Sequence, residues 1–248
     1  MSESSESDNS GSTFVQLSVD AGQFLEKLTG GAFEELGGLA ADWLRYQRLK
    51  FTADRLEGAR GMLREVSVES PKEVALSTLA PWLEGASVEE DPSLHEMWES
   101  LLANAGDPRD GSKKTHRSFV RILKQIEVPE QKVLEALYHI DEEAGEDESP
   151  FPYPVNSRIM GKMGELDQDY QPTERQIDLA KVNLVRLGLC SRSANIKAAP
   201  SGLGGGGPAP EPKEAPRGIH ISEFGSTFYR ACQPPESENE SGGNHSRG

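Results

Sequence analysis

The chain has 248 residues, a formal net charge of −15 and a hydrophobic fraction of 35%. A length of this order is typical of one or two domains, and the sequence contains no apolar run near the roughly 18 residues that a membrane-spanning helix needs. The acidic, serine-rich N-terminus predicts no secretory signal, so we expect a cytoplasmic protein without membrane insertion whose charge excludes nucleic-acid binding over its whole surface.

Polar tails are expected at both ends. Residues 1–12 and 233–248 are rich in Ser, Gly, Asn and Glu, and have almost nothing apolar to bury, so both are predicted to be disordered. Between them we expect two folded domains, a helical bundle over residues 13–126 and a second domain over residues 127–232. The predicted fold class is mainly α.

A long helix is predicted over residues 33–66. Apolar residues recur there at steps of three to five residues, which places most of them along one side of the helix. Such a stripe suits either a bundle helix or the seam of a coiled-coil dimer, and its irregular steps favour the bundle. A homo-oligomer formed through this helix remains the alternative.

Three more helices are predicted in the first domain. Ser70, Pro71 and Glu73 resemble a capping-box start for one helix, and Asp91 with Pro92 starts the next. A short helix follows over residues 118–125. The inward-facing residues predict a shared core, made of Trp82, Leu83, Trp98, Leu101 and Leu102.

The second domain has a different order of elements. We expect helices from Pro129, over residues 156–163, and after the capping box of Thr173 and Gln176, with Gly188 ending the third helix. Two short strands follow over 189–193 and 217–221, and then a helix capped by Ser222. This is the order of a winged helix-turn-helix with a two-stranded wing, whose Gly/Pro-rich insert, residues 197–216, is predicted to be disordered.

Patterns that carry catalysis or metal binding are scarce. His95 and Glu99 have the one-turn spacing of a zinc helix, but a second His and a third ligand are missing, so a solvated polar face is expected. Gly204 to Gly207 lack the strand, Lys and helix of a phosphate loop. Cys190 and Cys232 are expected to be free, partly buried thiols. We therefore expect no enzyme, no metal and no cofactor, and an active site assembled from distant loops is the least favoured alternative.

The third helix of a winged helix-turn-helix is the one that enters a DNA major groove. Periodicity predicts that Ile177, Ala180, Leu184 and Leu187 face inward on this helix. The candidate contacts to DNA or to a protein partner are therefore the residues expected on its surface, Arg175, Lys181, Asn183 and Arg186. Residues 173–232 hold eight basic and five acidic side chains, a surplus of only three (8 − 5), and phosphate contacts supply most DNA affinity. A protein-contacting or structural winged helix is favoured, and a DNA-binding transcriptional regulator is the alternative.

Two stretches, residues 79–105 and 116–125, resemble the Abi-alpha family of bacterial abortive-infection proteins. The residues that carry the resemblance are Trp82, Leu83, Glu84, Ala86, Ser87, Trp98, Leu101, Asn104, His116 and Phe119. Among them, His116 beside Lys113 and Lys114 suits either a phosphate contact or a polar loop before a helix. The resemblance implies a role in phage defence and brings no catalytic residues. We therefore expect a protein that acts through contacts with host or phage protein partners.

Overall fold

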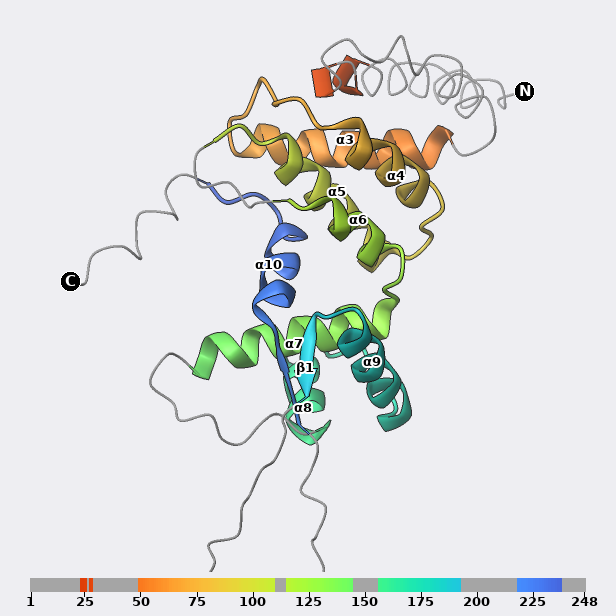
Figure 1. The fold of residues 1–248 in the computed structure, drawn as a ribbon, viewed down its shortest axis with the longest axis vertical. Helices are drawn as coiled ribbons and strands as arrows, with labels where there is room; N and C mark the ends of the chain where they lie inside the picture. Colours follow the sequence, from red (N-terminus) through yellow and green to blue (C-terminus); the bar gives the residue numbers. More distant parts are fainter. Residues whose placement is uncertain are drawn as a thin grey trace, which may run out of the picture. The chain divides into compact units, whose positions relative to one another are not determined.

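Helices make up most of the computed structural model, which describes residues 23–25, 27–28, 49–109, 115–144, 156–192 and 218–237 (Figure 1). The chain divides into two compact units, residues 1–128 with 227–248, and residues 129–226. The predicted tail 1–12, the insert 197–216 and the part of the long helix before residue 49 lie outside the described residues. The prediction of a mainly α protein is confirmed. Within the described ranges, no helix has both the length and the apolar character needed to cross a membrane.

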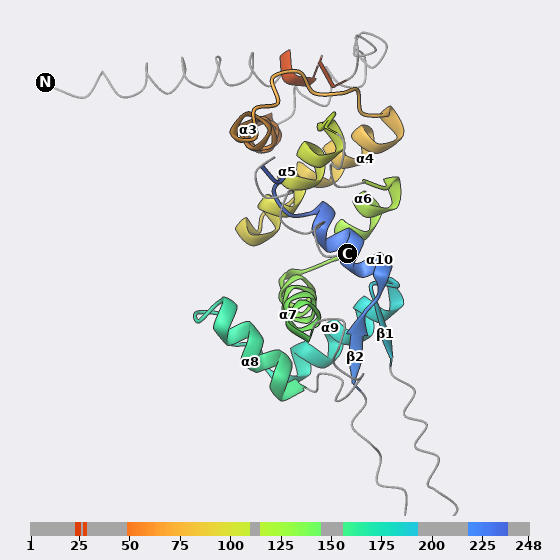
Figure 2. The same ribbon diagram turned by 90° about the vertical axis from the view of Figure 1, so that its left-hand side faces the viewer.

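The first unit is built around α5 (Pro92–Gly106), most of whose side chains are buried. This helix packs against α3 (Leu49–Glu65) and α4 (Leu76–Ala86), and α4 in turn packs against α6 (Arg117–Leu123) (Figure 2). The start of α5 is the predicted one, because the Asp91 side chain caps it by accepting a 2.9 Å hydrogen bond from the Ser93 amide. Of the predicted shared core, only Leu83 is half-buried, while the other four residues are buried.

The predicted helix start at Ser70 is wrong, because α4 begins at Leu76. The amide of Lys72 donates a 2.7 Å hydrogen bond to the carbonyl of Gly106, and the amide of Val74 donates one of 2.8 Å to the carbonyl of Leu28. These two bonds give the amides of Lys72 and Val74 acceptors outside the segment, so both are satisfied while the segment is extended. The Val74 side chain is buried, although its residue lies in this extended segment and not in a helix.

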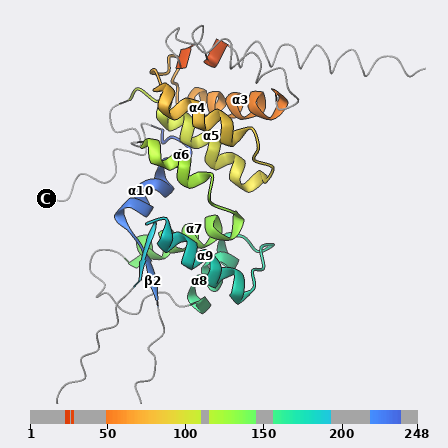
Figure 3. The ribbon, with the colours of Figure 1, turned by 45° about the vertical axis from the view of Figure 1, so that its right-hand side comes forward.

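The second unit contains α7 (Val128–Ala144) from Pro129 onward, α8 (Asn156–Leu166), α9 (Glu174–Arg186) and two short strands (Figure 3). Strand β1 (Cys190–Arg192) pairs antiparallel with β2 (Ile219–Ile221), with Ser191 opposite His220. The predicted order of three helices and two strands is therefore confirmed. The helix ends agree as well, since Thr173 and Gln176 form the capping box and Gly188 ends α9 with a φ of 76°.

The last helix, α10 (Glu223–Ala231), begins in the second unit and ends in the first. Ser222 caps it as predicted, because its hydroxyl accepts a 2.9 Å hydrogen bond from the amide of Gly225. The same hydroxyl donates to the carbonyl of Gly188 at 2.7 Å, which joins the end of α9 to the start of α10. Neither Cys190 nor Cys232 forms a disulfide, as predicted, and both side chains are buried.

Candidate functional site

The ten residues that carry the family resemblance lie in the first unit, and most of them are structural. Trp82, Trp98, Leu101, Ala86 and Phe119 are buried in its core. Four others lie near helix ends or on the surface. Leu83 is half-buried, and His116 precedes α6. The Glu84 carboxylate pairs with the Lys124 amine at 2.8 Å, and the Ser87 hydroxyl donates to the Glu84 carbonyl at 3.0 Å. These residues hold the bundle together and leave little exposed surface for a ligand.

Asn104 and Phe119 tie the end of the described chain to this bundle. The amide nitrogen Nδ2 of Asn104 donates to the carbonyls of Ala231 at 3.0 Å and Gln233 at 2.8 Å. The ring of Phe119 meets the ring of Phe228 edge to face, with 5.4 Å between centroids. The predicted disordered tail 233–248 therefore begins with residues that pack on the first unit, and Asn104 has a structural role.

His116 caps α6. Its Nδ1 accepts a 3.3 Å hydrogen bond from the amide of Ser118 and lies 2.7 Å from that residue's hydroxyl. An imidazole nitrogen that accepts from a helix N-terminus satisfies a backbone donor that has no partner within the helix. This geometry supports the polar-loop interpretation of His116 over a phosphate contact.

The expected solvated face of His95 and Glu99 is wrong for Glu99. Its side chain is only 15% exposed and forms an ion pair with Arg55 of α3, while His95 Nε2 lies 3.2 Å from the carbonyl of Glu89. Burial raises the pKa of the Glu99 carboxyl, although the bond from Arg55 works in the opposite direction. Across the described residues, no three His, Cys, Asp or Glu side chains gather in a group that could hold a metal ion.

On α9, three of the four predicted contact residues have partners inside the second unit, among them Arg186, which donates to Asn183 Oδ1 at 2.8 Å. Lys181 is only 13% exposed, and its amine lies 2.9 Å from Asn156 Oδ1 and 3.7 Å from Asp178 Oδ1. Asn183 donates to Glu130 Oε1 at 3.1 Å. The prediction that Lys181 is a free surface charge is therefore wrong, because α8 supplies a side chain that covers it.

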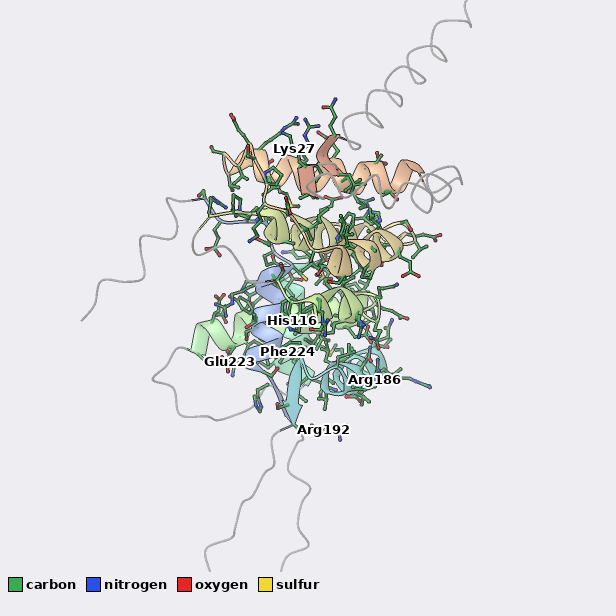
Figure 4. The ribbon with its side chains drawn as sticks, turned by 45° about the horizontal axis from the view of Figure 1, so that its top comes forward. Lys27, His116, Arg186, Arg192, Glu223 and Phe224 are labelled. Atoms are coloured by element: carbon green, nitrogen blue, oxygen red, sulfur yellow. The ribbon has the colours of Figure 1, made fainter. Side chains whose placement is uncertain are left out.

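The outward face of α9 carries two arginines with apolar residues between them. Arg175, Leu179, Val182 and Arg186 follow one another at steps of four, three and four residues, which places them along one side of the helix. Leu179 is 60% exposed and Val182 is 53% exposed, and both arginines are exposed too. Figure 4 labels Arg186 on this helix. We call these four residues the α9 stripe.

The α9 stripe is the largest departure from ordinary burial on a described helix. Large aliphatic side chains on an amphipathic surface helix normally face the core, and here Ile177, Ala180 and Leu184 fill that inner position. The two arginines are among the contacts predicted from sequence, whereas Leu179 and Val182 are not. Their spacing from Arg175 and Arg186 could have placed them on the same side of the helix.

One of three comparisons with known proteins gives a match. The family model described as Abortive infection alpha matches residues 44–232, which include all of the second unit and most of the described residues of the first. The comparison with curated proteins and the comparison with solved structures give no match. The matched range includes α3 to α6 of the first unit and the α9 stripe of the second.

Proposed function

This chain belongs to the abortive infection alpha family, and we propose that it acts in phage defence by binding a protein partner through the α9 stripe. Family membership supports the biological role, and the exposed residues of α9 support the mode of action. No catalytic step is part of the proposal. The partner is a host or phage protein.

One observation carries the proposal: Leu179 and Val182 are more than half exposed at the centre of a stripe bounded by Arg175 and Arg186. Apolar side chains gain free energy when a partner removes them from water, and arginines are enriched at protein interfaces, where they pair with carboxylates. A partner that fits this stripe presents apolar residues with carboxylates on either side. Full burial of the two aliphatic side chains would contribute about 1.5–3 kcal/mol each, before the costs of association.

The charge available on α9 supports a protein partner more than DNA. Lys181 is held by Asn156 and Asp178, so only Arg175 and Arg186 remain as exposed basic residues on this helix. Arg186 also donates to Asn183 Oδ1 at 2.8 Å. A duplex binder that makes about six to ten phosphate contacts uses about three to five times as many charges as these two arginines supply.

The second candidate is a winged-helix transcriptional regulator. The order α7, α8, α9, β1, β2 favours it, because a winged helix-turn-helix has three helices followed by a two-stranded wing. The exposed Arg192 on β1, labelled in Figure 4, would add one basic residue next to the wing. The residues of the wing insert, 197–216, are not among those described.

A homo-oligomer through helix 33–66 also stays a proposal. In the described part of that helix, Ala53, Leu56, Ala59 and Leu63 are buried within the chain itself, where α3 packs against α5. An exposed seam would therefore have to come from other positions of the helix.

The proposal is tested by co-purification from phage-infected cells with three tagged chains. They are the wild type, the double variant Leu179→Ser/Val182→Ser, and the matched control Val88→Ser, which removes a 49%-exposed apolar side chain from the first unit. We expect the same partner with the wild type and the control, and its loss with the double variant. Equal recovery with all three chains would contradict the α9 stripe as the contact.

The regulator is tested separately by titrating a library of duplexes at physiological salt. Tight binding of a defined duplex, lost in Arg175→Ala/Arg186→Ala, would replace our proposal with the second candidate. In that case the slope of log affinity against log salt should also fall by nearly two in the variant, because two phosphate contacts are removed.

A further inference from the structure

A cavity of about 290 Å³ lies in the first unit, between residues 23–28, the C-terminal half of α3 and the segment that follows it. It is lined by Gln23, Phe24, Lys27, Arg60, Leu63, Arg64, Val68, Glu69 and Pro71. We propose that this cavity binds a small organic phosphate, with the phosphate on the basic side chains and an apolar group against the buried wall. Such a site is independent of the α9 stripe.

The charge of the lining favours an anion. Three of its side chains are basic, Lys27, Arg60 and Arg64, against the single carboxylate of Glu69, in a chain whose net charge is −15. Figure 4 labels Lys27, which lies on the short helical segment beside α3. Among the described residues, the Lys27 amine has no hydrogen-bond or ion-pair partner.

The two arginines share one carboxylate. Arg60 Nη1 lies 3.3 Å from Glu57 Oε2, and Arg64 Nη1 lies 3.1 Å from Glu57 Oε1. A guanidinium group has five N–H donors, so a carboxylate shared between two of these groups leaves most donors for a ligand. Guanidinium groups bind phosphate oxygens in pairs, which a point charge such as an ammonium does not.

The apolar side of the cavity indicates that the ligand has an organic group as well as a phosphate. Phe24, Leu63 and Val68 are all buried, and Pro71 completes this wall. A bare inorganic anion would gain nothing from these side chains, whereas a ring or short chain would bury apolar surface against them. The volume lies just below the range of ligand pockets, which is about 300–1,000 Å³, so the cavity suits only a compact phosphate monoester.

The wall that follows α3 is shaped before any ligand binds. Ser67 adopts a left-handed φ of 62°, the amide of Ser67 donates to the Arg64 carbonyl at 2.9 Å, and the amide of Val68 donates to the Leu63 carbonyl at 2.8 Å. These bonds form a Schellman motif at the helix end. The opposite wall is held by the bond from the Val74 amide to the Leu28 carbonyl. Binding therefore needs little ordering of the backbone, which lowers its entropic cost.

The test uses the full chain and phenyl phosphate as the probe, with affinity measured by calorimetry and by amide shifts in NMR. We compare the wild type with Lys27→Gln/Arg64→Gln, two exposed residues of the cavity, and with Arg117→Gln/Arg121→Gln, two exposed arginines of α6 that carry the same charge change. Inorganic phosphate and benzyl alcohol are titrated alongside. Thermal melting confirms that all three chains are folded.

We expect saturable binding of phenyl phosphate with shifts at Leu63 and Val68, a loss of at least about tenfold in affinity in the cavity variant, and less than about twofold change in the α6 variant. Both partial probes should bind more weakly than phenyl phosphate. Four results would each overturn the proposal: absence of saturable binding, equal affinity in the cavity variant, benzyl alcohol binding as tightly as phenyl phosphate, or inorganic phosphate doing so.

Discussion

The indole Nε1 of Trp82 donates a 2.8 Å hydrogen bond to the backbone carbonyl of Trp98, and the two rings meet edge to face with 6.4 Å between their centroids. Both side chains are buried, so this hydrogen bond joins α4 to α5 within the apolar core. The position of the Trp82 side chain on α4 is therefore tied to the backbone of α5.

Removing one of these rings should destabilise the chain strongly. Trp98→Ala is expected to cost about 3–5 kcal/mol, because it leaves a large cavity in a buried site. Denaturant unfolding followed by circular dichroism measures the loss. The control Val88→Ala changes an exposed side chain and should stay within about 0.5 kcal/mol of the wild type. A similar stability for both variants would contradict the packing.

Gly85 lets the Trp98 ring lie directly against α4. A Cβ at this position would overlap the Cη2 atom of Trp98, a rigid ring that has no room to withdraw in the core. Gly85→Ala should therefore cost about 1–3 kcal/mol, as overpacking does. The matched control is Gly61→Ala in α3, where a Cβ meets nothing within 4 Å. That change should stabilise the helix by up to about 1 kcal/mol, and thermal melting of both variants should give shifts of opposite sign.

Local signals predicted much of this fold correctly. The capping box of Thr173, the cap at Asp91 and the left-handed Gly188 all depend on residues within one helical turn, so their geometry can be expected from sequence alone. The start at Ser70 has the same local pattern and fails. There, the amides of Lys72 and Val74 bind carbonyls far away in the chain, and no local pattern reports such partners.

Periodicity predicted which face of a helix is buried but not what covers the other face. The inner residues Ile177, Ala180 and Leu184 of α9 were identified correctly, whereas Lys181 was assigned to the surface although Asn156 of α8 lies against it. The cavity beside α3 could not be foreseen for a related reason. Its lining comes from separate segments that only the tertiary fold brings together.

The ion pair at the end of α5 should make stability depend on pH in acid. Burial of the Asp107 carboxyl opposes its ionisation, but hydrogen bonds and charge from Arg109 outweigh burial and hold the pKa of Asp107 below its ordinary 3.8. The stabilisation is therefore fully present above that ordinary value and is lost as the pH falls through the lower pKa of the folded state.

Asp107→Asn should remove this dependence. At neutral pH the variant is expected to be less stable by about 1.5–3 kcal/mol, because it weakens charged hydrogen bonds to Arg109, and the gap to the wild type should close as the solution is acidified. Urea unfolding at a series of pH values measures it, with the exposed Glu90→Gln as the control. A gap that stays constant down to pH 2 would contradict the assignment.

The two thiols should be unreactive in the folded chain. Burial raises the pKa of Cys190 to about 12, so at pH 8 only about one thiol in ten thousand is ionised, and Cys232 is buried as well. A thiol-reactive chromophore should therefore label both residues only after unfolding. Single variants Cys190→Ser and Cys232→Ser assign the signal. Rapid labelling of Cys190 in the native chain would show that the strand region opens easily.

The efficiency of phage plating on cells that carry the wild type, Leu179→Ser/Val182→Ser or Val88→Ser tests the central claim most directly. Thermal melting first establishes that the two variants are as well folded as the wild type. We predict that the wild type and Val88→Ser lower the efficiency of plating to the same degree, whereas the double variant gives little or no protection. Full protection by the double variant, or no protection by the wild type, would contradict the account.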